Sequence, residues 1–158
     1  MLTRRAGGAR SSRVVERVAV VDASLAEAWA FFGDPRNLEA ITPPWLRFRI
    51  DAAPDELRAG SYLRYRLHLF GIPVRWLTVI AAWQPPHRFV DVQLSGPYAL
   101  WEHTHRLVAV EGGTEIYDHV RYRLPLGPLG ALASPIVAAL LVRIFAFRGR
   151  RTAELLAR

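Results

Sequence analysis

The sequence predicts an α+β fold, in which a curved antiparallel sheet is followed by one long C-terminal helix. The chain has 158 residues, 51% of them hydrophobic, which suits one domain with a sizeable core. Eleven glycines and eleven prolines favour short strands joined by tight turns. From residue 129 onward the apolar residues instead recur with helical spacing.

The N-terminal part is expected to form a strand and two helices. The strand covers Val14–Val21. Ser24 with Glu27 three residues later has the spacing of a capping box, so a helix is expected over Leu25–Phe32 until a Gly-Asp-Pro sequence ends it. A second, short helix is expected over Asn37–Ile41, where Thr-Pro-Pro follows.

Six further strands are expected between residues 45 and 124. Each connection after the first is a short glycine or proline turn, which favours hairpins between neighbours. The expected strands are Trp45–Asp51, Ser61–Phe70, Val74–Trp83, His87–Leu94, Tyr98–Val110 and Thr114–Leu124.

The C-terminal helix is expected over Leu129–Arg158. Its first part is almost free of polar residues, but Pro135 interrupts it and Arg143 follows, so it falls short of the ~20 apolar residues that cross a bilayer. We therefore expect a buried core helix and no integral membrane segment. The residues expected to pack on the core and form one cavity wall are Leu132, Ile136, Leu140, Ile144 and Phe147.

Charge and cysteine content exclude several classes of protein. The chain has no cysteine, which excludes disulfides and thiolate metal sites. Its net charge of +7 comes from arginines concentrated at both ends, so we expect no nucleic-acid binding. We predict a disordered arginine-rich tail over 1–13, one domain over 14–158 and a cytoplasmic location. Peripheral contact with a membrane or a partner domain stays open.

The last hairpin separates an apolar face from a charged one. If Glu111 opposes Thr114 across a Gly-Gly turn, His105 lies opposite Val120 and His103 opposite Tyr122 on a mostly apolar face. The other face pairs Glu102 with Arg123, Thr104 with Arg121 and Arg106 with His119, and is expected to meet water.

The preceding hairpins extend the inner face. With Phe70 opposite Pro73, the side chains of Tyr65, Trp76 and Thr78 point inward. With Ile80 opposite Asp91, the inner face gains Phe89, Asp91 and Gln93. A bulge would instead turn the apolar residues of that strand inward.

The inner face then carries more polar groups than a packed core needs. Buried carboxylates must pair with histidines, bind water or meet a ligand. A cavity with orienting polar groups satisfies this requirement. The expected ligand-binding residues are Tyr65, Trp76, Thr78, Phe89, Asp91, Gln93, Trp101, His103, His105, Asp118 and Tyr122.

Several stretches resemble a known superfamily. They are 34–38 (DPRNL), 41–46 (ITPPWL), 71–76 (GIPVRW), 89–93 (FVDVQ), 96–98 (GPY), 101–105 (WEHTH), 113–114 (GT), Asp118 and 122–127 (YRLPLG). The chain resembles the SRPBCC superfamily of START and Bet v 1-like helix-grip proteins. Within it, the chain is similar to the bacterial ligand-binding and cyclase/dehydrase-like members, some of which are fused to sugar-epimerase-like domains. The resemblance implies a helix-grip fold with a cavity between sheet and C-terminal helix. It implies signature positions at Asp91, Gln93, Trp101, His103, His105 and Asp118 without assigning their chemistry.

Three readings of the inner polar residues remain open. The first is the binding of a hydrophobic or aromatic small molecule, lipid- or polyketide-like. The second is a cyclase or dehydratase using an Asp–His acid–base pair, with Asp91, His103 and His105 as catalytic candidates. The third is a zinc- or iron-like site at His103, His105 and a carboxylate, which a His-X-His pattern alone supports weakly, so we expect no metal and no cofactor. No nucleophile-elbow, phosphate-loop or dinucleotide motif is present.

Overall fold

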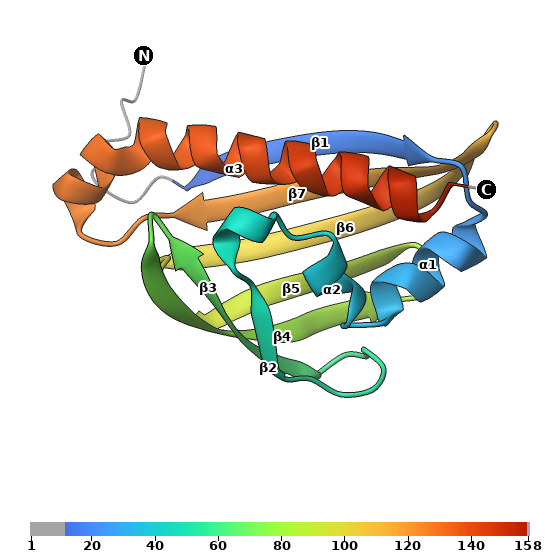
Figure 1. The fold of residues 1–158 in the computed structure, drawn as a ribbon, viewed down its shortest axis with the longest axis horizontal. Helices are drawn as coiled ribbons and strands as arrows, with labels where there is room; N and C mark the ends of the chain where they lie inside the picture. The colour runs from blue at the N-terminus through green and yellow to red at the C-terminus, as the bar shows by residue number, and fades with distance from the viewer. Residues whose placement is uncertain (1–11, 158) are drawn as a thin grey trace, which may run out of the picture.

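One antiparallel sheet of seven strands forms the frame of the molecule (Figure 1). The computed structural model describes residues 12–157. The strands lie in the order β1-β7-β6-β5-β4-β3-β2, so all neighbours except β1 and β7 are consecutive in the chain. This confirms the predicted α+β, helix-grip fold class. The predicted tail over 1–13 lies largely outside the described residues, and Arg13 already belongs to β1.

The elements follow the predicted order with small shifts at their ends. The strands are β1 (Arg13–Val21), β2 (Arg49–Ala52), β3 (Tyr62–Leu69), β4 (Ile72–Gln84), β5 (Arg88–Ser95), β6 (Leu100–Val110) and β7 (Gly113–Arg123). The helices are α1 (Leu25–Gly33), α2 (Asn37–Ala40), the 3-10 helix η1 (Pro44–Leu46) and α3 (Gly127–Leu155). The capping box at Ser24 and Glu27 is present.

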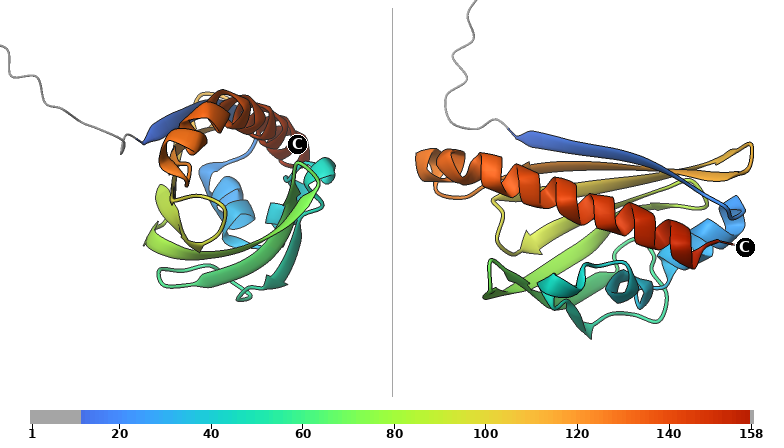
Figure 2. Two further views of the ribbon diagram at one scale, coloured as in Figure 1. Left: turned by 90° about the vertical axis from the view of Figure 1, so that its left-hand side faces the viewer. Right: turned by 45° about the horizontal axis from the view of Figure 1, so that its top comes forward.

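The sheet curls around one side of α3. Seen along its long axis, the sheet forms an open trough, and α3 closes the side that the strands leave open (Figure 2). The main core cluster lies between them and includes Trp76, Trp101 and Val120 from the sheet and Leu141 and Phe145 from α3. The sheet and α3 are thus joined mainly by aromatic and aliphatic packing.

The pairing of β6 with β7 differs from the predicted register by two residues. His105 lies opposite Asp118, and His103 opposite Val120, because the chain turns at Glu111-Gly112 and not at Gly112-Gly113. Gly112 supplies the positive φ of 83° that this turn needs. A shift by two preserves the face of every side chain, so the predicted inner and outer faces are confirmed.

The other hairpins show the same behaviour. Leu69 pairs with Ile72, which again moves the register by two and leaves the predicted inner face unchanged. The predicted pairing of Ile80 with Asp91 is confirmed. The β4–β5 ladder shifts on both sides of this stretch, between Leu77 and Thr78 and between Ile80 and Ala82. The second shift lies between the turn and the Ile80–Asp91 pair, and the extra residue is on β4, so the alternation of Phe89, Asp91 and Gln93 along β5 is kept.

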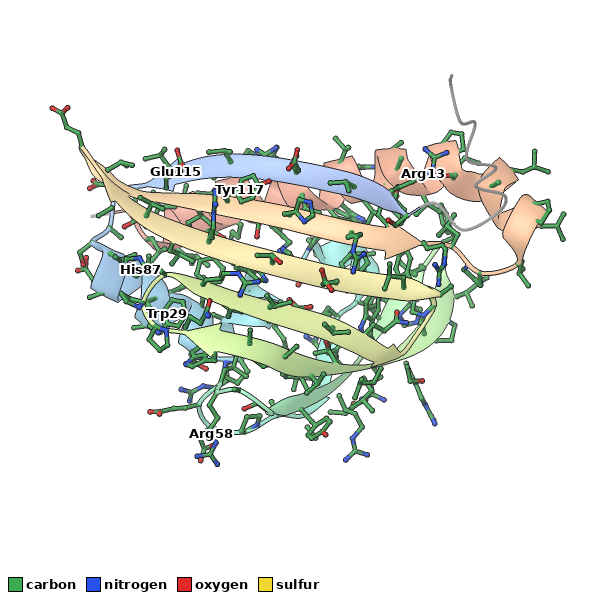
Figure 3. All side chains as sticks on the ribbon, turned by 180° about the vertical axis from the view of Figure 1, so that it is seen from behind. Arg13, Trp29, Arg58, His87, Glu115 and Tyr117 are labelled. Carbon is green, nitrogen blue, oxygen red and sulfur yellow. The ribbon has the colours of Figure 1, made fainter. Side chains whose placement is uncertain are left out.

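The outer face of the sheet carries the charged residues. The Tyr117 hydroxyl donates to the Glu16 carboxylate, and Arg121 pairs with Glu102 at 3.1 Å, not with Thr104 as predicted. Arg106 covers the Tyr117 ring with 4.9 Å between guanidinium carbon and ring centroid. Figure 3 shows this face, with Tyr117 and Glu115 on β7. These pairs account for the complementary charges predicted for the wetted side.

Two predictions about local structure are wrong. The segment Trp45–Asp51 is not one strand, because η1 and a left-handed residue, Arg47, precede β2. Pro135 does not interrupt α3, which runs through it.

The predicted stripe on α3 is also partly wrong. Leu132 and Ile136, which were expected in the core, are 77% and 62% exposed, and the neighbouring Leu129 is 67% exposed. By length and composition α3 could cross a membrane. Its Leu141 and Phe145, however, belong to the main core cluster. The N-terminal half of α3 therefore presents an apolar stripe outward, and its C-terminal half supplies the core contacts.

Gly113 tests how closely β1 and β7 must approach. A Cβ at Gly113 would lie 1.9 Å from the Val21 carbonyl oxygen, and φ there is 152°. Gly113→Ala is expected to lower the free energy of unfolding by roughly 3 kcal/mol, from overpacking plus backbone strain. Gly71→Ala, with φ 78° and open space around the Cβ, is the control and is expected to cost about 1 kcal/mol. Urea unfolding measures the loss of stability in both variants. Equal losses would contradict a close approach of Gly113 to the Val21 carbonyl group.

Candidate functional site

A cavity of about 140 Å³ lies between the inner face of the sheet and α3. Its walls are mostly apolar and aromatic. Of the expected aromatic residues, Tyr65, Trp76, Phe89 and Trp101 line it. The structure therefore brings together side chains from β3, β4, β5 and β6, which are distant in sequence.

Four of the expected polar residues also line the cavity. They are Thr78, Asp91, His103 and His105. The Thr78 hydroxyl donates to the Val92 carbonyl oxygen at 2.8 Å, so it is already engaged across β4 and β5. The other three, Asp91, His103 and His105, are the titratable residues among the four.

The remaining three expected residues do not line the cavity. The Gln93 side chain donates from Nε2 to the Tyr98 carbonyl at 2.8 Å and accepts from the Tyr98 N–H at 3.2 Å, so it holds the turn before β6. Tyr122 is 1% exposed within the main core cluster. Asp118 lies behind the two imidazoles. Ligand contact by Gln93, Asp118 and Tyr122 stays a prediction, and the structure places all three outside the cavity lining.

The wall supplied by α3 contains residues that the sequence reasoning missed. Leu141, Phe145 and Arg148 line the cavity together with Ile144, which was expected. These residues are spaced three and four apart, which is the sequence signal for one face of a helix. This face is rotated about the helix axis from the predicted face, with which it shares Ile144. Arg148 places a cation at the wall opposite the sheet.

Strand pairing explains why two aspartates and two histidines meet. His103 and His105 are two residues apart on β6 and so share its inner face. Asp91 on β5 is directly opposite His103, and Asp118 on β7 is directly opposite His105. Since β6 lies between β5 and β7, the imidazoles are flanked by one carboxylate on each side.

Each imidazole spans the two carboxylates. His103 Nε2 is 2.9 Å from Asp118 Oδ1, and its Nδ1 is 3.5 Å from Asp91 Oδ2. His105 Nε2 is 3.1 Å from Asp91 Oδ2, and its Nδ1 is 3.0 Å from Asp118 Oδ1. The last contact has an ion-pair distance, but the N–H does not point at the oxygen, which leaves Nδ1 without an aligned hydrogen bond. We call these four residues the Asp–His cluster.

Aromatic rings fix the imidazoles in place. Phe89 stacks on His105 with 4.0 Å between centroids and 11° between planes. Phe145 meets His103 edge-on at 5.2 Å. The imidazole centroids themselves are 3.7 Å apart. Both histidine side chains are 4% exposed, so the cluster is held rigidly and largely away from water.

The electrostatics of the cluster follow from burial and from the neighbouring charges. Burial opposes a charge on His105, but its contacts with Asp118 and Asp91 outweigh burial and raise its pKa. Burial and the charge of His105 together lower the pKa of His103 despite Asp118. The cluster therefore makes His105 easier to protonate than His103.

Both carboxyl groups stay ionised. Burial alone would raise the pKa of Asp118, but the hydrogen bond from His103 and the close contact with His105 hold it far below its ordinary value. The pKa of Asp91 is also lowered, because the two histidines offset its burial and Arg148 adds a further positive charge. The side chains of Asp91 and Asp118 keep 17% and 18% of their area exposed, which eases the cost of these charges.

Part of this cluster also has the composition of a metal site. One donor atom each from Asp91, His103 and His105 lies within 4.8 Å of the others. Two imidazoles and a carboxylate are ligands that zinc and iron accept. The same residues can therefore serve as hydrogen-bonding groups, as an acid–base pair or as ligands.

Comparisons with known proteins agree with this architecture. A model of the family described as "Polyketide cyclase / dehydrase and lipid transport" matches residues 12–157. No curated protein matches the sequence. The Zhui aromatase/cyclase from Streptomyces sp. R1128 is similar in fold, with a TM-score of 0.76 and 15% identity over 92% of this chain and 94% of that one.

Two further solved structures share the fold. A protein from Rhodobacter sphaeroides has a TM-score of 0.67 and 21% identity over 90% of this chain and 91% of that one. The nucleoside-diphosphate sugar epimerase from Corynebacterium glutamicum has a TM-score of 0.68 and 23% identity over 89% of this chain but 28% of its own length. At these identities the likeness concerns the fold.

The Asp–His cluster generates a stability prediction. Asp118→Ala leaves both imidazoles without their shared acceptor, so the free energy of unfolding is expected to fall by about 3 kcal/mol. Glu102→Ala removes the exposed partner of Arg121 on the outer face of the same hairpin and is expected to cost less than about 1 kcal/mol. Urea unfolding at neutral pH measures both. Similar losses for the two variants would show that the cluster contributes no more than a surface pair.

Proposed function

The chain belongs to the polyketide cyclase / dehydrase and lipid transport family, and on that basis we propose that it binds a hydrophobic or aromatic small molecule in the cavity between the sheet and α3. The observation that carries this proposal is a mostly apolar, aromatic cavity into which a compact group of polar side chains, Asp91, His103 and His105, projects from the sheet. Such a lining favours burial of an apolar body and orientation of one polar group. The Asp–His cluster is the place where that polar group would bind.

The size of the cavity limits what can enter without movement. A closed apolar space of roughly 150 Å³ accommodates a molecule the size of benzene. At about 140 Å³, this cavity has room for one aromatic ring or a short aliphatic group. A polycyclic or long-chain ligand requires α3 or the surrounding side chains to move outward.

The cluster supports one alternative, an enzyme of cyclase or dehydratase type. His105 and Asp91 are 3.1 Å apart at the cavity wall, so an imidazole is oriented by a carboxylate, as general bases are. In a dehydration, such a base takes the proton beside a carbonyl and returns a proton to the departing hydroxyl, which leaves as water. The polyketide cyclase members of the family make this alternative specific.

The binding function predicts that filling the cavity removes the ligand. Ile144 lines the cavity, so Ile144→Trp is expected to reduce the amount of co-purifying small molecule at least about tenfold by excluding it sterically. Ile136 is exposed on the same helix, so Ile136→Trp is the matched control and is expected to leave that amount unchanged. Extraction of the folded protein followed by mass spectrometry measures the ligand. Finding no molecule enriched in the native protein, or the same amount in both variants, would contradict the proposal.

The enzymatic alternative predicts a separation of turnover from binding. With an aryl β-hydroxyketone as the probe, Asp91→Asn is expected to lower the rate of water loss about 10²- to 10⁴-fold. Its dissociation constant for the probe is expected to change little, since the amide keeps the size of the carboxyl group. Chromatographic assay of the unsaturated product and titration followed by the intrinsic tryptophan fluorescence, to which Trp76 and Trp101 in the cavity lining contribute, measure the two quantities. No turnover by the native protein, with binding intact, would leave binding as the function.

A further inference from the structure

The donor atoms that face one another across the Asp–His cluster have the spacing of ligands around one ion. Asp91 Oδ2 is 3.1 Å from His105 Nε2 and 3.5 Å from His103 Nδ1. Two ligands held tetrahedrally at zinc–nitrogen and zinc–oxygen distances lie about 3.3 Å apart. The 3.5 Å contact is too long for a good hydrogen bond and lies within the range for two ligands of one metal.

The nitrogen atoms on the other side of both rings meet a single carboxylate. His103 Nε2 and His105 Nδ1 are 2.9 and 3.0 Å from Asp118 Oδ1. A metal-binding histidine typically donates its second N–H to a carboxylate, which sets the tautomer and turns the free nitrogen toward the metal. Asp118 has this position for His103, with which it forms a hydrogen bond, and its Oδ1 is also close to His105 Nδ1, although that N–H is not aligned with it. Asp118 is not among the residues that line the cavity.

Proton count also favours a cation on the Asp91 side. The two imidazoles make four close contacts with carboxylate oxygens. Only a doubly protonated imidazole donates from both nitrogens, and two such cations with centroids 3.7 Å apart would repel. Without a metal, at least one bare nitrogen therefore faces a carboxylate oxygen. A divalent ion on the Asp91 side allows two neutral rings, with His103 Nδ1 and His105 Nε2 turned toward the metal and the other nitrogen of each ring on the Asp118 side.

We propose that Asp91, His103 and His105 bind a divalent first-row transition metal such as Zn²⁺, with Asp118 as the positioning residue for both histidines. This reverses the expectation of no metal drawn from the sequence. Three protein ligands leave a coordination position open, and since all three line the cavity, it faces the space where a small molecule would lie. Metal binding is measured without any ligand, so it stands or falls separately from the proposed function.

The first test uses the native full-length protein. After treatment with a chelator and dialysis, titration with Zn²⁺ alone is expected to show one ion bound per chain. X-ray absorption of the zinc-loaded protein is expected to show only nitrogen and oxygen ligands at about 2.0–2.1 Å. Titration with Co²⁺ is expected to give the visible absorption of a four- or five-coordinate ion. No binding by calorimetry and no such absorption would overturn the proposal without any variant being made.

The second test assigns the ligands. His105→Gln and Asp91→Asn are expected to abolish the cobalt absorption, and Asp118→Asn is expected to weaken Zn²⁺ binding about 10- to 100-fold while keeping that absorption. His119→Ala is the matched control, because His119 lies opposite Thr104 on the outer face of the same hairpin, and is expected to bind Zn²⁺ as the native protein does. Circular dichroism confirms folding of each variant. Undiminished binding by folded His105→Gln would place the metal elsewhere and overturn the assignment, and an unchanged affinity of Asp118→Asn would remove its positioning role.

Discussion

The position of β6 between β5 and β7 is the constraint on which the candidate site depends. Both inward histidines come from β6, and each needs a carboxylate from the strand beside it. A slip of either neighbour by one residue would carry its aspartate to the outer face and leave each buried imidazole with only one of its two carboxylate partners. The backbone hydrogen bonds between the strands and the electrostatic contacts between the side chains therefore specify the same register of β5 and β7 relative to β6.

The placement of α3 turns this polar cluster into the wall of a cavity. Without the helix, the inner face of the sheet would be open to water, and the charges of Asp91 and Asp118 would be screened. With Leu141 and Phe145 packed over the trough, the same charges act in a medium of low polarity, where interactions between charged groups are stronger. Arg148 brings a compensating positive charge from the helix side. The ligand and metal proposals both depend on this enclosure.

The sequence was a good guide to the faces of the strands and a poor one to contacts between elements far apart. Alternation of side chains located His103 and His105 on the inner face even though the β6–β7 turn was placed wrongly, because the error in register was two residues. Asp91 was located correctly because its predicted pairing with Ile80 is the observed one. The role of Gln93 was missed because its partner is the backbone of Tyr98, and backbone partners leave no pattern in the side chains.

The face of α3 that packs on the sheet was chosen wrongly for a related reason. The first half of the helix is apolar all round, so periodicity could not tell Leu132 from Leu141. Only the curvature of the sheet, which depends on all seven strands, decides where the helix makes contact. Arg148, which lines the cavity from the last part of α3, was unrecognisable among the other arginines near the C-terminus.

The outward apolar stripe on α3 also governs how copies of this protein meet in solution. Leu129, Leu132 and Ile136 form an exposed apolar patch that favours association, while the net charge of +7 makes copies of the protein repel one another. Dissolved salt shortens the reach of that repulsion to about 8 Å at physiological ionic strength but leaves the attraction between apolar surfaces intact. Colloidal stability is therefore highest in dilute buffer and declines as electrolyte is added.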